Sequence, residues 1–260
     1  MKRNMEKSIK RYLHLVAALL FISGSELATA NCDQSITKIE DTLVFPDANS
    51  KTRFLESLAS ECKGSPAYAL KLSEFYISAR QYPLAEKLLT EAIQAKTPMD
   101  SQLRFALADM YFVSSQLEKS RIEAEKIVAR YPEWGAGYFV LGSALLFQDK
   151  NIAAVANLEK AAALTNEAEA YCSLAFAYHK LGKNVETIQA MEKAVSLDKR
   201  SYANPIAVPA WVYASAKLDR LDDARKLLII HQHYRPESQT DPEFARAVKY
   251  VEEKLKKRKG

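Results

Sequence analysis

Glycine is scarce in this sequence, with 7 residues among 260. A chain rich in β-hairpins needs many tight turns with positive φ, and such turns favour glycine. The scarcity therefore argues against a barrel or sandwich built from hairpins. It also argues against glycine-rich loops that bind phosphate groups.

Side chains for catalysis and metal binding are also few. The sequence has 4 histidines and no H-E-x-x-H, G-x-S-x-G, P-loop or C-x-x-C motif. His231 and His233 are two positions apart, so on a helix they would not share a face as a pair of metal ligands. The acidic stretch 218–223 lacks EF-hand spacing. We expect a non-catalytic chain with no cofactor and no metal site, and a hydrolase or redox enzyme is the alternative of another class.

The apolar run at residues 12–22 is too short to span a bilayer, which takes about 20 residues. The small residues Ala28, Thr29 and Ala30 lie beyond it. Five basic side chains precede it: Lys2, Arg3, Lys7, Lys10 and Arg11. This order of basic, apolar and small residues is typical of a secretory signal peptide. We predict export to the periplasm or the cell exterior with cleavage after Ala30, and the alternatives are an uncleaved anchor and lipidation of Cys32.

Cysteine is rare, with 3 residues, and export would place all of them in an oxidising compartment. Residues 33–44 and 51–62 both show apolar residues at helical spacing. Folded as an antiparallel hairpin, these helices would bring Cys32 close to Cys62. We predict a disulfide between them, with Cys172 left as a small side chain within a helix. A redox-active Cys172 is the alternative.

A repeat of 33 to 37 residues fills the middle of the chain. The five units begin near Pro66, Ser101, Gly135, Ala168 and Pro205. In four units a small residue is followed three places later by a large one: Ser73 and Tyr76, Ala108 and Tyr111, Gly142 and Leu145, Ala175 and Tyr178. The second half of each unit also carries a small residue: Ala85, Ser120, Ala154, Thr187 and Ala224. The fifth unit has Val212 at the small position, and we expect an irregular loop around residues 201–205.

This pattern resembles the tetratricopeptide repeat (TPR) family, whose unit is a helix–turn–helix of about 34 residues. The resemblance covers about residues 66–238 and implies an all-α fold, a right-handed α-solenoid of helix–turn–helix repeats with helical caps. The expected organisation follows the chain in four parts: a signal peptide (1–30), an N-terminal helical hairpin as a cap (31–64), five repeats (65–238), and a C-terminal capping helix with a basic tail (239–260). Ser50 and Asp241 are the expected N-caps of the two capping elements.

The resemblance also implies where a partner binds. In the family, the first helices of successive units line a concave groove that holds a segment of a partner protein. The matching positions here are mostly aromatic and apolar: Phe105, Asp109, Phe112, Phe139, Leu146, Phe147, Phe176, His179 and Tyr213. Aromatic side chains are typical anchors at interfaces, so we predict a groove for a protein or peptide segment. The alternative is that these phenylalanines are packed core.

The net charge of +5 belongs to the two ends of the chain. Residues 31–253 carry 27 basic and 30 acidic side chains. The C-terminal basic run is Lys254, Lys256, Lys257, Arg258 and Lys259. One explanation of this run is that cations are stabilising at a helix C-terminus. The alternative is that the run contacts an anionic membrane surface. We therefore expect a scaffold or adaptor of the cell envelope, with an assembly factor at the membrane as the runner-up and no nucleic-acid partner.

Overall fold

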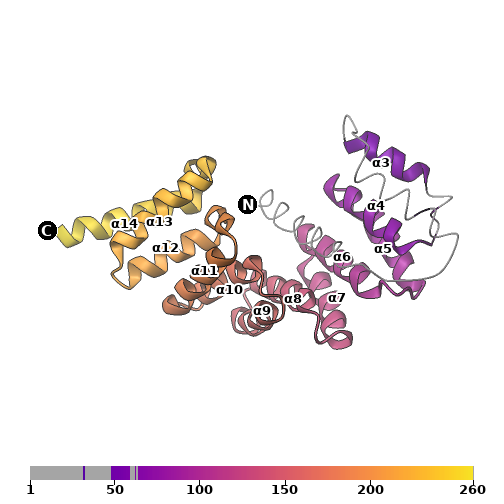
Figure 1. Cartoon of the computed structure of the whole chain (residues 1–260), viewed down its shortest axis with the longest axis horizontal. Helices are drawn as coiled ribbons and strands as arrows, with labels where there is room; N and C mark the ends of the chain where they lie inside the picture. The colour runs from indigo at the N-terminus through magenta and orange to yellow at the C-terminus, as the bar shows by residue number, and fades with distance from the viewer. Residues whose placement is uncertain (1–31, 33–47, 59–61, 63, 260) are drawn as a thin grey trace. The chain divides into compact units, whose positions relative to one another are not determined.

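The computed structural model describes residue 32, residues 48–58, residue 62 and residues 64–259. The expected signal peptide (1–30) with its cleavage site, and the expected helix at 33–44, lie outside the described residues. The described chain is helical throughout, without strands (Figure 1). It divides into two compact units on either side of the bond between Pro132 and Glu133. We describe each unit by itself.

The N-terminal unit contains one helix followed by two helical hairpins. Its helices are α3 (Ala48–Ser57), α4 (Pro66–Ser78), α5 (Tyr82–Gln94), α6 (Asp100–Val113) and α7 (Leu117–Arg130). Helix α4 packs against α3, α5 and α6, and α6 also packs against α5 and α7. The buried side chains of α3, α4 and α5 form one core with the apolar side of α6. A helical hairpin cannot bury its apolar face alone, and stacking against its neighbours supplies this core.

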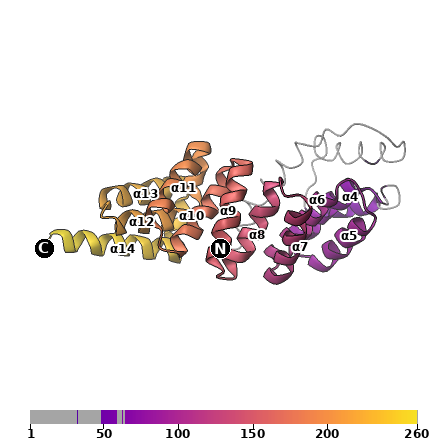
Figure 2. The same cartoon turned by 90° about the horizontal axis from the view of Figure 1, so that it is seen from below.

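The C-terminal unit contains three hairpins and a final helix. Its helices are α8 (Gly135–Phe147), α9 (Asn151–Thr165), α10 (Ala168–Lys180), α11 (Asn184–Leu197), α12 (Ala207–Lys217), α13 (Leu221–Tyr234) and α14 (Pro242–Lys259). Figure 2 shows these helices from a second direction. Two short 3₁₀ helices join them, η1 (Lys199–Ala203) and η2 (Pro236–Thr240). The segment expected to be an irregular loop therefore begins as η1, in which the backbone N–H of Arg200 bonds Asp198 Oδ1. Helix α14 packs against α12 and α13.

Every hairpin turns in the same way. The residue with positive φ follows the first helix in each of the five, and it is Arg80, Ser115, Asp149, Gly182 or Asp219. The next backbone N–H bonds a carbonyl five residues back, as from Gln81 to Tyr76 (2.7 Å). This pattern ends a helix with a left-handed residue, where glycine is the usual choice. Four of the five turns use another residue, which is how a chain so poor in glycine builds them.

The small residues of the repeat lie where helices approach most closely. Ser73, Ala108 and Ala175 are fully buried. A Cβ on Gly142 would lie 2.7 Å from Leu158 Cγ of α9, which is closer than two carbon atoms can approach. The repeated pattern of small and large residues in the sequence therefore reflects the close packing of the helices. Pro209 is tolerated because it lies in the first turn of α12.

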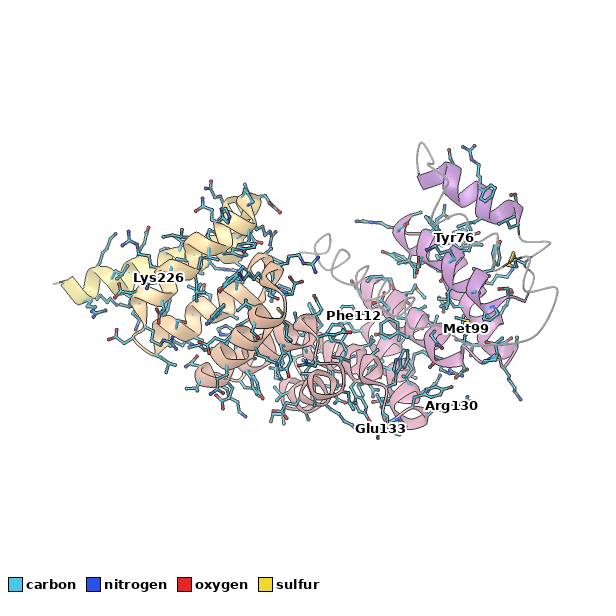
Figure 3. The ribbon with its side chains drawn as sticks, in the orientation of Figure 1. Tyr76, Met99, Phe112, Arg130, Glu133 and Lys226 are labelled. Atoms are coloured by element: carbon cyan, nitrogen blue, oxygen red, sulfur yellow. A yellow bond between two sulfur atoms is a disulfide. The ribbon has the colours of Figure 1, made fainter. Side chains whose placement is uncertain are left out.

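In three of the four units the large residue is a tyrosine, whose hydroxyl links its helix to the preceding helix. The donor is a tyrosine on a first helix, and the acceptor is a glutamate on the helix before it. The pairs are Tyr76 to Glu56 (2.8 Å), Tyr111 to Glu86 (2.7 Å) and Tyr178 to Glu159 (2.5 Å). Tyr76 lies between α3 and α4 (Figure 3). Burial and the Glu56 carboxylate raise the pKa of Tyr76 to about 12, so its hydroxyl remains a donor at neutral pH.

The N-terminal end of the described chain is closed by a disulfide between Cys32 and Cys62 (Figure 3), as predicted. Their Cα atoms are 5.3 Å apart, and both residues are buried. The helix expected at 51–62 is shorter: α3 ends at Ser57, and Cys62 follows in a bend. Helix α3 also begins at Ala48, so the expected N-cap at Ser50 is wrong, because Ser50 lies inside the helix.

Candidate functional site

Three of the expected groove residues lie on α6 in the N-terminal unit. Phe105, Asp109 and Phe112 are spaced by four and three positions, which places them on one face of the helix. All three are buried, with exposed fractions of 2%, 4% and 7%. Phe112 is labelled on this helix in Figure 3. Burial of all three leaves the choice between a groove and a packed core to substitution experiments.

Asp109 differs from the other buried carboxylate of α6, Asp100. Asp100 is 5% exposed, and its Oδ2 accepts from Arg104 Nε (3.0 Å) and Tyr131 Oη (3.1 Å). Arg130 Nη1 adds a third contact to the same oxygen at 3.3 Å. Asp109 has no such partner among the described residues, and burial alone raises its pKa from 3.8 to about 7. A carboxyl that is buried without a counter-charge is costly for the fold when it ionises.

Three more of the expected residues lie on α8 in the C-terminal unit. Phe139 and Leu146 are buried, and Phe147, the last residue of the helix, is partly exposed. Every residue of α8 from Gly135 to Leu146 is buried. A helix that is apolar and buried on all sides does not reveal a binding face by its own pattern. The assignment of these three residues to a groove stays a prediction.

Two of the three remaining expected residues, His179 and Tyr213, meet in a row of aromatic rings on first helices of the C-terminal unit. His179 of α10 stacks on Tyr213 of α12, with ring centroids 5.8 Å apart. Tyr213 in turn contacts Tyr250 of α14 at 5.2 Å. All three side chains are partly exposed, as is Phe176 one turn before His179. We call His179, Tyr213 and Tyr250 the aromatic row.

Tyr250 is the member that the sequence prediction missed. It lies 37 positions after Tyr213, which equals the spacing between the last two units of the repeat. Extending the repeat by one further unit would have found it. Helix α14 therefore occupies the place of another first helix, and it carries its own ring into the row.

The electrostatics of the row are set by burial and by neighbouring cations. Burial and Lys217 lower the pKa of His179, and Glu243 of α14 acts in the opposite direction. Burial also raises the pKa of the Tyr213 hydroxyl. At neutral pH the rings of His179 and Tyr213 are therefore uncharged. The row can bury apolar groups and donate hydrogen bonds, as interface tyrosines do.

The described residues offer no group of metal ligands. Within that part of the chain, no three side chains of His, Cys, Asp or Glu lie together as an ion site requires. His231 is buried against Phe244, whereas His233 is exposed beside Tyr234. The free thiol of Cys172 is buried, and burial raises its pKa well above the ordinary range. A protonated, inaccessible thiol is a poor nucleophile.

No described helix combines the length and the apolar character needed to cross a membrane. No protein-family model matches the sequence, and no curated protein matches it.

Solved structures do resemble this chain. MamA is 21% identical, with a TM-score of 0.55 over 65% of this chain and 96% of its own. YrrB, described as a TPR protein with an unusual peptide-binding site, is 16% identical, with a TM-score of 0.55 over 75% of this chain and 97% of its own. A thermophilic TPR protein of Thermus thermophilus is 19% identical, with a TM-score of 0.53 over 70% of this chain and 97% of its own. Helical hairpins at the spacing of the repeat and these structural likenesses agree, and the chain has the fold of the tetratricopeptide repeat proteins.

Proposed function

We propose that this protein is a non-catalytic scaffold of the cell envelope that binds a segment of a partner protein along its first helices. The aromatic row carries the proposal, because three partly exposed rings lie in contact on successive first helices. The expected groove residues on α6, α8 and α10 belong to the same proposal. The fold supports a role in protein interaction, and YrrB, which shares it, is described as having a peptide-binding site.

The physical basis is preorganisation. Each ring of the row is held by a helix that packs against its neighbours, so binding orders few additional side chains. Association then loses less conformational entropy than it would for a mobile surface. Tyrosine also gives a large apolar contact together with a hydroxyl for hydrogen bonding.

The location in the envelope rests on two features. Residues 1–30 have the order of an export signal, and the Cys32–Cys62 disulfide is typical of an oxidising compartment. Detection of the N-terminus of the protein purified from its native cells tests this part of the proposal. A mature chain that begins at Asn31 is expected, and one that begins at Met1 would refute cleavage.

The binding surface can be tested by site-specific crosslinking in intact envelopes. A photoreactive residue at Tyr213 is compared with one at Ile229, which is 61% exposed on the second helix α13. We expect a discrete crosslinked protein from position 213 and none from 229. Tyr250→Ala should then reduce the yield from 213, because Tyr250 contacts Tyr213 in the row. Equal yields from 213 and 229 would refute a specific surface at the row.

A second candidate is an assembly factor held at an anionic membrane by its C-terminal helix. The observation in its favour is that Lys254, Lys256, Lys257 and Arg258 are all exposed on α14. Each basic side chain near an anionic bilayer contributes about 1 kcal/mol of attraction. Flotation with vesicles that contain anionic lipid compares the full chain with a chain that ends at Glu253. Equal flotation of both chains would remove this candidate.

A further inference from the structure

Two aromatic contacts hold α14 against the rest of the C-terminal unit. Near its start, Phe244 packs on the ring of His231 of α13, with centroids 5.2 Å apart. Two turns later, Tyr250 packs on Tyr213 of α12. Phe244 and Val251 are buried, so α14 docks by its apolar stripe. The first of these contacts rests on a titratable side chain.

His231 is fully buried, with an exposed fraction of 0%. Its Nδ1 lies 2.6 Å from the carbonyl oxygen of Tyr202 in η1, so the imidazole must donate from Nδ1. Its Nε2 is buried and has no hydrogen-bond partner among the described residues. The ring is therefore neutral, with Nε2 unprotonated inside the contact that docks α14.

The charged groups around His231 are one cation and two carboxylates that the cation already contacts. Arg235 follows the last residue of α13 and is 9% exposed. Its guanidinium lies 3.5 Å from carboxylate oxygens of both Glu237 in η2 and Asp241 just before α14. These two carboxylates are thus already engaged by Arg235. Burial is the largest effect and lowers the pKa of His231, as does the Arg235 charge. The hydrogen bond to Tyr202 and the carboxylates of Asp241 and Glu237 act in the opposite direction without reversing the shift.

We propose that protonation of His231 at Nε2 releases α14 from the C-terminal unit. An imidazolium needs a partner for its new N–H, but the ring faces Phe244, and the carboxylates of Asp241 and Glu237 are already paired with Arg235. Release gives the ring access to water. It also removes Tyr250 from the aromatic row, so acidification would change the partner-binding surface. This last step rests on the proposed function, whereas the release itself does not.

His179 is the other histidine close to α14, and its surroundings differ. It faces Lys180 and Lys217, which disfavour its protonation, and Glu243 of α14, which favours it. A protonated His179 would attract α14 through Glu243 and would oppose release. The sign of the response to acid therefore identifies which of the two histidines controls the helix.

Hydrogen exchange of α14 amides in the full chain tests the release directly. A released His231 titrates near its ordinary pKa of about 6.5, so the released fraction should rise by up to about thirtyfold between pH 7.5 and pH 5.0. After correction for intrinsic rates, we expect exchange in α14 to rise by roughly tenfold to thirtyfold on this basis. Amides of α9 serve as the internal control and should change little.

His231→Asn keeps a side-chain N–H near the Tyr202 carbonyl and does not titrate. In this variant α14 should exchange with little dependence on pH, whereas His233→Asn, at the exposed histidine two positions away, should behave as the native chain. Since His231→Asn also removes ring volume, NMR titration of the native His231 ring provides a second measurement. Protection of α14 at pH 5.0 equal to that at pH 7.5 would overturn the proposal.

The effect on the partner surface is measured separately by the crosslink from position 213 at both pH values. Loss of the crosslink at pH 5.0 in the native chain, but not in His231→Asn, supports control of the surface by His231. Acid-dependent exchange in α14 with an unchanged crosslink would keep the release and refute the link to binding. A missing crosslink at pH 7.5 would refute the proposed function alone.

Discussion

Replacement of Asp109 by asparagine is expected to stabilise the protein at pH 8. Asp109 is buried on α6 without a described counter-charge, and burial raises its pKa from 3.8 to about 7. The folded state therefore binds a proton that the unfolded chain has already lost. The contribution of Asp109 to the free energy of unfolding is therefore most favourable below pH 3.8. It is lost as the pH rises through 7, where the carboxyl ionises in the folded state. A pKa difference of about three units corresponds to about 4 kcal/mol, which is an upper bound for the loss.

Asparagine has nearly the same shape and no charge at any pH. Asp109→Asn should therefore raise the free energy of unfolding by about 2 to 4 kcal/mol at pH 8, and by much less at pH 4.5. The difference is measured by denaturant unfolding at both pH values. Hydrogen exchange of α6 amides reports on unfolding of the N-terminal unit. Comparing the pH dependence of the free energy of unfolding between the variant and the native chain separates the effect of Asp109 from that of the other carboxylates.

Asp100→Asn is the matched control, because Asp100 lies on the same helix with nearly the same burial. It removes the carboxylate that Arg104 and Tyr131 contact, and it should destabilise by about 1 to 3 kcal/mol at pH 8. Opposite signs for the two variants are thus expected. If Asp109→Asn destabilised the protein at pH 8, the carboxylate would have a partner, and the reasoning from an isolated buried charge would fail.

Three further substitutions test the packing. Gly142→Ala should destabilise by about 1 to 3 kcal/mol in thermal unfolding, because its Cβ would overlap Leu158; an unchanged Tm would contradict the close approach. Tyr111→Phe should destabilise by about 1 kcal/mol through loss of the hydrogen bond to Glu86, and a double-mutant cycle with Glu86→Gln should show that the two effects are not additive. Cys62→Ser should destabilise the oxidised protein by about 3 to 4 kcal/mol, and the difference from the native chain should vanish under reducing conditions.

The repeat boundaries could be predicted from the sequence because helix breakers and residue size recur together. The first helices begin at Pro66, Gly135 and Ala168, as the spacing predicted, and at Asp100 and Ala207 within two positions of the prediction. Packing of one hairpin on the next restricts the same positions in every unit, and this restriction is visible in a single sequence.

The turns and the ends could not be predicted in the same way. Arg80 and Ser115 adopt positive φ, although nothing in their chemistry favours it, because the hairpin contacts on either side determine the turn. The 3₁₀ helix η1 depends on Asp198 bonding a backbone N–H two residues on, which spacing alone does not reveal. Helix α3 precedes the repeat, so the repeat spacing could not predict where this helix begins and ends.

The candidate site was predicted in part. His179 and Tyr213 meet as ring neighbours because both occupy the same place on successive first helices. Tyr250 was not predicted as a site residue because α14 was expected to be a cap and not a continuation of the repeat. For Phe105, Phe112 and Phe139, the sequence predicted a groove with a packed core as the alternative; the structure buries all three, and the groove stays a prediction. Residue type reports affinity for apolar surroundings, and only packing decides what supplies them.

The disulfide also bears on how the chain would avoid mispairing during oxidative folding. Cys32 and Cys62 close a loop with a sequence separation of 30, which is shorter than one repeat. Pairing of Cys62 with Cys172 would close a loop of about 110 residues, at an additional entropic cost of about 1 kcal/mol. The native bridge thus joins two residues at the N-terminal end of the chain, whereas Cys172 is buried on α10 in the C-terminal unit. An odd number of cysteines can in this way yield one product, because loop length favours the right pair early and burial protects the third thiol afterwards.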